Sequence, residues 1–185
     1  MKTVTITKKE INYILALAKK RHDAKSDNIK NTGILMDRDL NNPVENYLPH
    51  FIGIVGEYAW AKHTNRSVDE NIYEVRDSED FDGEEIKTIT YYGHGEPELK
   101  IKVTEFDSKK PKKYILARTN KEKILKALTV NAENAIDIEL LGVISRNDFD
   151  TNKTIKRYGA KNPLNYIKKW SMDYRTIKRL LQRFS

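Results

Sequence analysis

The chain has 185 residues, of which 38% are hydrophobic and 33% charged, a balance that suits one domain with a hydrophobic core beneath a heavily charged surface. It contains no cysteine, which excludes a disulfide framework and a thiolate zinc site. No apolar run is long enough to cross a membrane, and the first residues lack the apolar core of a signal peptide, so we expect a cytoplasmic protein.

The net charge of +7 favours polyanionic partners, because cationic side chains release the counterions condensed on a polyanion. Residues 151–185 contain one acid, Asp173, and aromatic side chains are interleaved among the bases, a pattern typical of a phosphate-binding surface. The bases from which we expect nucleic-acid contacts here are Lys168, Lys169, Arg175, Lys178 and Arg179. The composition, rich in Lys, Asn and Ile, is typical of an AT-rich bacterial or phage genome.

A first helix is predicted over residues 7–24, because Thr7 and Glu10 form a capping box ahead of an apolar stripe. Arg21 and Lys25 lie one helical turn apart at its end, where they are candidates for holding a phosphate; a solvated helix end is the alternative. The polar segment 26–46 is predicted to be a long loop, and loops of that length are often functional.

A second helix is predicted over residues 49–64. It is apolar on nearly all sides and therefore expected to be buried. Gly53 and Gly56 lower its helix propensity, which makes sense where another backbone packs closely. Glu57 is an acid within this apolar segment, so it needs a cation, a metal or a solvent-filled cleft.

The remaining elements are mostly strands. We predict strands over residues 71–75, 85–91, 99–104, 113–118 and 138–144, and a short helix over 121–128. A loop then leads to a basic helix over 174–184, capped by Asp173. This order predicts a single α/β domain over residues 1–185, with residues 151–185 as its basic extension.

The segment 80–88 carries the strongest candidate chemistry. Glu85 and Lys87 alternate with Ile86 along a predicted strand, so they share one face while Ile86 points into the core. Asp80 lies just upstream, and Gly83 allows a tight bend between them. Carboxylates held beside an ammonium group can bind a divalent metal, typically magnesium, and orient a water for phosphodiester hydrolysis.

Two motifs together carry a family resemblance. Gly53-x-x-Gly56-Glu57-x-Ala59 on a helix, followed by Asp80-Phe81-x-Gly83-x-Glu85-Ile86-Lys87-Thr88, resembles the PD-(D/E)xK nuclease superfamily, which includes restriction endonucleases, Holliday-junction resolvases and many phage nucleases. The resemblance covers residues 49–143 and departs from the pattern in that no proline precedes the aspartate.

That resemblance implies a restriction-endonuclease-like core, with a central mixed β-sheet flanked by helices, and a DNA endonuclease dependent on Mg²⁺ or Mn²⁺. By position, Asp80 and Glu85 would bind the metal, Lys87 would be the catalytic lysine and Glu57 would supply the acid from the helix. A homodimer is one arrangement in which such an enzyme provides a site for each strand.

Several alternatives remain open at this point. Asp82 or Asp77 could replace Asp80 as the upstream acid, and Glu98-Leu99-Lys100 offers a second acid-x-lysine pair, with Asp82 or Glu85 as its first acid. Asp23-x-Lys25, Asp107-x-Lys109 and Glu122 beside Lys123 show how often acids and lysines fall together in so charged a chain. The alternative functions are a non-catalytic nucleic-acid-binding protein derived from such a nuclease and a structural or inhibitory partner of another protein.

Overall fold

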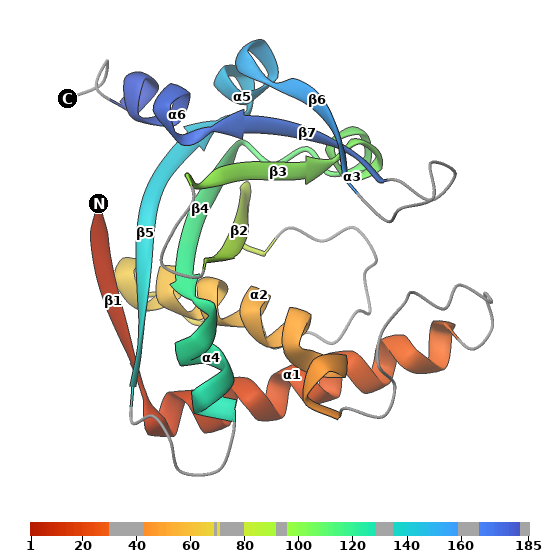
Figure 1. Ribbon diagram of the computed structural model, residues 1–185, viewed down its shortest axis with the longest axis vertical. Coiled ribbons are helices and arrows are strands. Elements are labelled where there is room, and N and C mark those ends of the chain that lie inside the picture. Colours follow the sequence, from red (N-terminus) through yellow and green to blue (C-terminus); the bar gives the residue numbers. More distant parts are fainter. Residues whose placement is uncertain are drawn as a thin grey trace.

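The computed structural model describes residues 1–29, 43–68, 70, 80–91, 96–128, 135–158 and 167–181. Their elements run in the following order (Figure 1): β1 (Lys2–Thr7), α1 (Lys8–Ile29), α2 (Pro43–Thr64), β2 (Glu84–Tyr91), β3 (Glu98–Lys102), α3 (Val103–Ser108), β4 (Lys113–Asn120), α4 (Lys121–Leu128), β5 (Ala135–Ser145), α5 (Arg146–Asn152), β6 (Thr154–Tyr158), β7 (Ile167–Asp173) and α6 (Tyr174–Leu181).

The strands form two sheets. A four-stranded sheet has the order β1-β5-β4-β2, in which β2 runs parallel to β4 and the other pairs are antiparallel. A three-stranded antiparallel sheet has the order β3-β7-β6. The predicted α/β class with a mixed sheet flanked by helices is confirmed. None of the helices in the described residues is long and apolar enough to cross a membrane.

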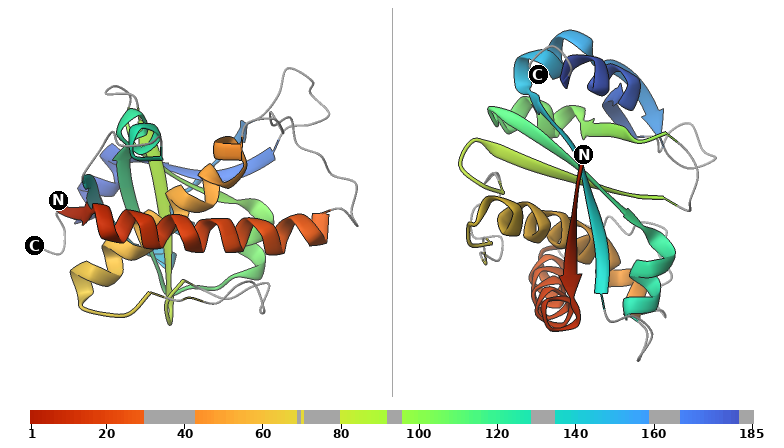
Figure 2. Two further views of the ribbon diagram at one scale, coloured as in Figure 1. Left: turned by 90° about the horizontal axis from the view of Figure 1, so that it is seen from below. Right: turned by 90° about the vertical axis from the view of Figure 1, so that its left-hand side faces the viewer.

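The four-stranded sheet is the middle layer. Helices α1 and α2 cover one face, and the three-stranded sheet with α5 and α6 covers the other (Figures 1 and 2). Ile86 and Ile115 face the helices together with Ile14 and Phe51. Leu116 and Tyr114 face the second layer, where they join Leu99, Phe149 and Ile177. β2 is an edge strand of this middle sheet, so its alternating side chains point toward two different layers.

Most predicted elements of the central chain are confirmed. β2, β4, α4 and β5 match the predicted positions within a few residues. The capping box also forms, since the backbone N–H of Thr7 donates to Glu10 Oε2 at 2.7 Å and α1 follows. Asp173 caps α6, because its Oδ1 accepts from the backbone N–H of Thr176 at 2.8 Å.

Other predictions were wrong. The loop over 26–46 is shorter at both ends, since α1 continues to Ile29 and α2 begins at Pro43, whose fixed φ suits the first turn of a helix. The loop expected after β5 instead holds α5, β6 and β7. The third strand ends at Lys102, and α3 follows it directly. The strand predicted over 71–75 and the end of the last helix beyond 181 lie outside the described residues.

Gly56 sets the distance between α2 and β2. A Cβ atom at this position would lie 1.8 Å from Thr88 Oγ1 and 3.0 Å from Thr88 Cβ. Thr88 Oγ1 is buried and has no hydrogen-bond partner in the described part of the chain. The close approach predicted from the two helical glycines is therefore found at Gly56; at Gly53 the nearest atom to such a Cβ is Glu57 Oε1 at 3.9 Å.

We expect Gly56→Ala to lower the free energy of unfolding by about 1–3 kcal/mol, because the added methyl group overpacks the contact with Thr88. Thr88→Ala removes the clashing hydroxyl. The double variant should therefore lose less unfolding free energy than the two single variants lose in sum. Gly53→Ala is the matched control, since it gains helix propensity of up to about 1 kcal/mol without a clash. Urea unfolding of the wild type, the two single variants and the double variant measures the coupling, and strictly additive changes would contradict the contact.

Candidate active site

The predicted pair Glu85 and Lys87 lies on one face of β2. Lys87 Nζ donates to Glu85 Oε1 at 2.8 Å, while Ile86 points the other way into the helix-facing core. Glu85 is only 3% exposed. A charged carboxylate so deeply buried needs partners, and Lys87 is the first of them.

Two further residues complete this side of the cluster, and both come from the segment after β3. Lys109 Nζ donates to both carboxylate oxygens of Glu85, at 3.1 and 3.2 Å. Glu105, on α3, forms an ion pair with Lys87. Lys109 belongs to the pair Asp107-x-Lys109, one of several such pairs in this charged sequence. Glu105 was not predicted as a site residue, because no helix was predicted over its segment.

Asp80 is held at the start of β2 by a turn. Phe81 and Glu84 form an isolated bridge across it, and Gly83 adopts a positive φ of 71°, a conformation that glycine accepts readily. The turn brings Asp80 Oδ2 to 2.7 Å from the backbone nitrogen of Ile86, which donates to it. The bend predicted at Gly83 is therefore present, and it directs Asp80 back onto the strand.

Glu57 reaches the same neighbourhood from α2. Its two carboxylate oxygens accept from Arg21 Nη1 at 3.1 and 3.0 Å, so the acid has the cation that its burial requires. Arg21 comes from α1, which packs beside α2. The predicted phosphate contact of Arg21 remains a prediction, and in this structure its guanidinium lies on Glu57.

The electrostatics join these acids into one cluster. Burial raises the pKa of Asp80 well above its ordinary value, and the negative charges of Glu57 and Glu85 raise that pKa further. The hydrogen bond from Ile86 and the charge of Lys87 oppose this shift without cancelling it. Glu57 from α2 and Glu85 from β2 thus both act on Asp80.

Lys87 remains a cation in this setting. Burial alone would lower its pKa, but the carboxylates of Glu85 and Glu105 outweigh burial and raise the pKa above the ordinary value of lysine. The pKa of Glu105 is lowered correspondingly: burial would raise it, and Lys87 more than compensates. Lys87 is therefore equipped to donate hydrogen bonds and stabilise negative charge, and it is poorly suited to act as a base.

Glu84, the residue next to Glu85, is a useful contrast. It points to the opposite face of β2, where Trp60 Nε1 donates to it at 2.6 Å and Lys113 Nζ lies 2.7 Å away. Arg66 is a third partner. Burial opposes ionisation, but the hydrogen bonds from these three donors outweigh it and lower the pKa of Glu84 to about 2. Glu84 is thus a fully paired structural acid, whereas Asp80 faces mainly other acids.

The alternative motif residues lie elsewhere. Glu98 is on the three-stranded sheet, where Lys156, Lys100 and Ser171 bind it. Asp82 is exposed on the turn, and Asp77 lies outside the described residues. The structure therefore places Asp80 with Glu85 and Lys87, the residues of the motif over 80–88, and not with Glu98 and Lys100.

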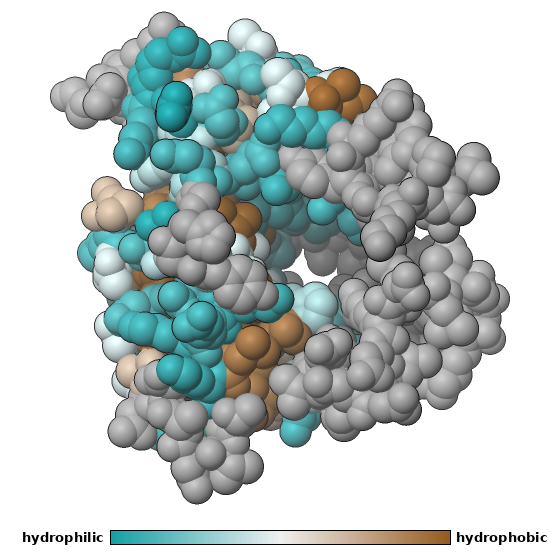
Figure 3. All heavy atoms as spheres, in the orientation of Figure 1, coloured by the Kyte–Doolittle hydropathy of each residue, from teal (hydrophilic) through white to brown (hydrophobic). Residues whose placement is uncertain are grey.

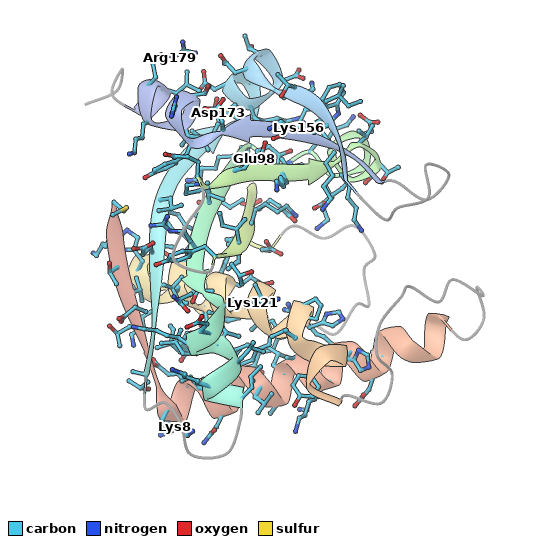
Figure 4. The ribbon with its side chains drawn as sticks, viewed as in Figure 1. Lys8, Glu98, Lys121, Lys156, Asp173 and Arg179 are labelled. Atoms are coloured by element: carbon cyan, nitrogen blue, oxygen red, sulfur yellow. The ribbon has the colours of Figure 1, made fainter. Side chains whose placement is uncertain are left out.

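The predicted nucleic-acid contacts whose side chains the structure describes are distributed over α1, β7 and α6. Arg175, Lys178 and Arg179 lie on α6, and Arg21 lies on α1 in the opposite outer layer (Figures 1 and 4). Lys169 is on β7, in the three-stranded sheet. Lys25 belongs to α1 and Lys168 to β7, but their side chains lie outside the described part.

The donor set of Asp80, Glu57 and Glu85 consists of hard oxygens, which suits magnesium or manganese. Nevertheless, no three or more His, Asp or Glu side chains in the described ranges are arranged as a metal site. Glu57 and Glu85 instead carry Arg21, Lys87 and Lys109. The chemistry of the donors fits a hard cation, and binding one would require it to compete with these ion pairs.

Fold and site together define an α/β protein with a buried cluster of acids and lysines at the edge strand of a mixed sheet. No protein-family model, curated protein or solved structure matches this chain. The resemblance to the PD-(D/E)xK nucleases is therefore one of sequence motif alone.

We expect Asp80→Asn to stabilise the protein at pH 7 by about 1 kcal/mol, which corresponds to a rise of about 2–4 °C in Tm for a chain of this size. The amide removes a repelled negative charge and still accepts the hydrogen bond from Ile86. A raised pKa in the folded state penalises the ionised form, so wild-type stability should fall as pH rises above about 3.8 toward the folded pKa. Thermal unfolding across pH checks this, and a variant less stable than wild type at pH 7 would contradict it.

We expect Glu84→Gln, in contrast, to lower the free energy of unfolding at pH 7. A folded pKa of about 2 against an ordinary 4.5 corresponds to at most about 3 kcal/mol of stability at pH 7. This stability is present above pH 4.5 and is lost as pH falls toward 2, so the difference between wild type and variant should shrink over that interval. Urea unfolding at several pH values measures it, with the exposed acid Glu122→Gln as control. A difference independent of pH would show that the effect is steric.

Proposed function

We propose that this protein is a metal-dependent DNA endonuclease that hydrolyses phosphodiester bonds at the cluster around β2, in a core like that of the restriction endonucleases. The observation that carries the proposal is the convergence of Glu57, Asp80 and Glu85 from separate parts of the chain beside a protonated Lys87. A fold gains no stability from mutually repelling acids, which makes a functional reason for their proximity the better explanation.

Each side chain has a role that its surroundings support. Asp80 and Glu85, assisted by Glu57, would hold Mg²⁺ or Mn²⁺, which supplies a bound water of lowered pKa when present. Lys87 would donate to the phosphate oxygens, where negative charge develops as the water attacks. Glu105 supports this role, because its ion pair keeps Lys87 charged and oriented. Lys109 would offer a second positive charge beside the scissile phosphate.

One observation favours the alternative of a non-catalytic nucleic-acid-binding protein. The carboxylates of Glu57 and Glu85 are neutralised by Arg21, Lys87 and Lys109. In such a protein these ion pairs would be permanent parts of the core. Nucleic-acid binding without metal-dependent cleavage would then be the complete activity.

The decisive experiment is plasmid cleavage with Mg²⁺ or Mn²⁺. We expect Lys87→Ala and Glu85→Ala each to reduce the rate by about 100-fold or more, as loss of a group that stabilises transition-state charge does. Glu122→Ala and Lys123→Ala are matched controls, because they remove an acid and a lysine from exposed positions on α4. Loss of activity in Glu98→Ala with full activity in Glu85→Ala would instead assign the alternative spacing.

Metal binding can be tested without any turnover. Mn²⁺ or Mg²⁺ should raise the Tm of wild type, with a gain of about 2.7 kcal/mol at one hundred times the dissociation constant. Asp80→Asn should start from a higher Tm and gain little from metal. Equal metal-induced gains in both proteins would remove Asp80 from the site, and no gain in wild type with no cleavage would leave the non-catalytic alternative.

A further inference from the structure

The three-stranded sheet carries a row of lysines on one face. Lys102 of β3 pairs with Lys169 of β7, and Lys169 pairs on its other side with Lys156 of β6. Directly paired residues on neighbouring antiparallel strands project to the same face, so these three side chains stand in line across the sheet. Neighbouring strands lie about 4.8 Å apart, and the row therefore spans about 10 Å.

On the opposite face, β3 and the end of β7 are apolar and buried, whereas Ile155 of β6 is 53% exposed. Leu99, Ile101 and Met172 alternate with the residues of the lysine face and belong to the second core. On the lysine face, Lys100 and Ser171 form the next cross-strand pair beside the row. β3 and β7 thus use one face for packing, and the other face of the sheet presents amino groups.

Like charges placed directly opposite one another destabilise a sheet. The cost is visible at Lys169, whose pKa is lowered by burial and then by the charges of Lys102 and Lys100. Glu98 partly offsets this repulsion at the other end of the face, where it pairs with Lys156 and Lys100 (Figure 4). Any polar residue would suffice on a sheet face that only contacts water. Three adjacent lysines repel one another there, so their alignment favours a polyanionic partner.

The row also leads to the acid–lysine cluster. Lys102 is the residue immediately before α3, and Glu105 in the first turn of that helix forms the ion pair with Lys87. The charges of Glu105 and Lys87 both act on Lys169. In Figure 3 hydrophilic side chains cover much of the upper part of the molecule, where Figure 1 places the three-stranded sheet. A chain of phosphates lying on the row would therefore run toward the proposed site.

We propose that Lys102, Lys169 and Lys156 form a track that binds the backbone phosphates of a nucleic-acid strand and directs that strand to Glu85 and Lys87. The choice of partner rests on the proposed nuclease function. Lysine contributes a point charge and little directional recognition, so the track holds the backbone independently of base sequence. This places the main phosphate contacts on the sheet face, and α6 is not needed for them.

The test measures binding in EDTA, which separates it from cleavage. Lys102→Gln/Lys169→Gln is compared with wild type for a fluorescent DNA oligonucleotide across a range of NaCl concentrations. We expect at least a tenfold weaker affinity at 0.1 M salt and a slope of log affinity against log salt that is smaller by about 1.5–2, as loss of two phosphate contacts predicts. Lys102→Arg/Lys169→Arg keeps the charge and should bind within about threefold of wild type.

Lys2→Gln/Lys20→Gln is the matched control, because it removes the same charge from exposed positions on β1 and α1. It should change the affinity less than twofold. Since the row variant relieves repulsion, its Tm should not fall, and an unchanged Tm rules out misfolding as the cause. Equal losses in the row variant and the control would overturn the track, as would equal affinity of wild type for polyglutamate and DNA. Binding that depends on the row in a protein that cuts no DNA with any metal would retain the track and refute the proposed catalysis.

Discussion

The position of β2 at the edge of the central sheet is the constraint from which the site follows. Its side chains alternate between two layers, so Ile86 and Thr88 meet α2 while Glu85 and Lys87 meet α3. An interior strand would have a neighbour on both sides, and no chain could bend around it to deliver an acid. The free edge of β2 lets Asp80 fold back on the strand, and the absence of a side chain at Gly56 brings α2, with Glu57, close enough to influence it.

The neighbouring acids Glu84 and Glu85 show that this fold is able to neutralise a buried carboxylate fully. Glu84 has an indole, a lysine and an arginine as partners, and its pKa falls accordingly. Asp80 receives one backbone hydrogen bond and the repulsion of two acids. The pKa of Asp80 is raised and that of Glu84, four residues away, is lowered, and this contrast supports a role for Asp80 within the proposed nuclease function.

The sequence alone was sufficient for whatever depends on local periodicity. The alternation that places Glu85 and Lys87 on one face, the capping box at Thr7 and the cap at Asp173 are all local patterns, and all are found. β1 is the exception, because no strand was predicted there although Val4 and Ile6 alternate with polar residues. The start of α2 at Pro43 also has a local signal, because proline is favoured at the first position of a helix.

What escaped prediction depends on pairing over long separations in the chain. The lysine row arises only because β3 lies against β7, which follows it by about seventy residues. Lys169 was predicted as a nucleic-acid contact from the basic C-terminal region, but Lys102 stands out among 34 lysines and arginines only once this pairing aligns the two. Similarly, Glu105 and Lys109 become partners of Lys87 and Glu85 only after the connection from β2 to β4 brings α3 over the edge strand.

The acid–lysine cluster and the lysine row are electrostatically linked. Glu57 and Glu85 repel Asp80, and Lys102 and Lys100 repel Lys169. Lys87, in its ion pair with Glu105, acts on both Asp80 and Lys169. A hard cation relieves the first repulsion and a phosphate relieves the second. Within the proposed function the two ligands should therefore assist each other, because a phosphate that also touches the metal neutralises both regions at once. The charge arrangement that weakens the free protein is the same one that would bind a metal and a nucleic-acid backbone together.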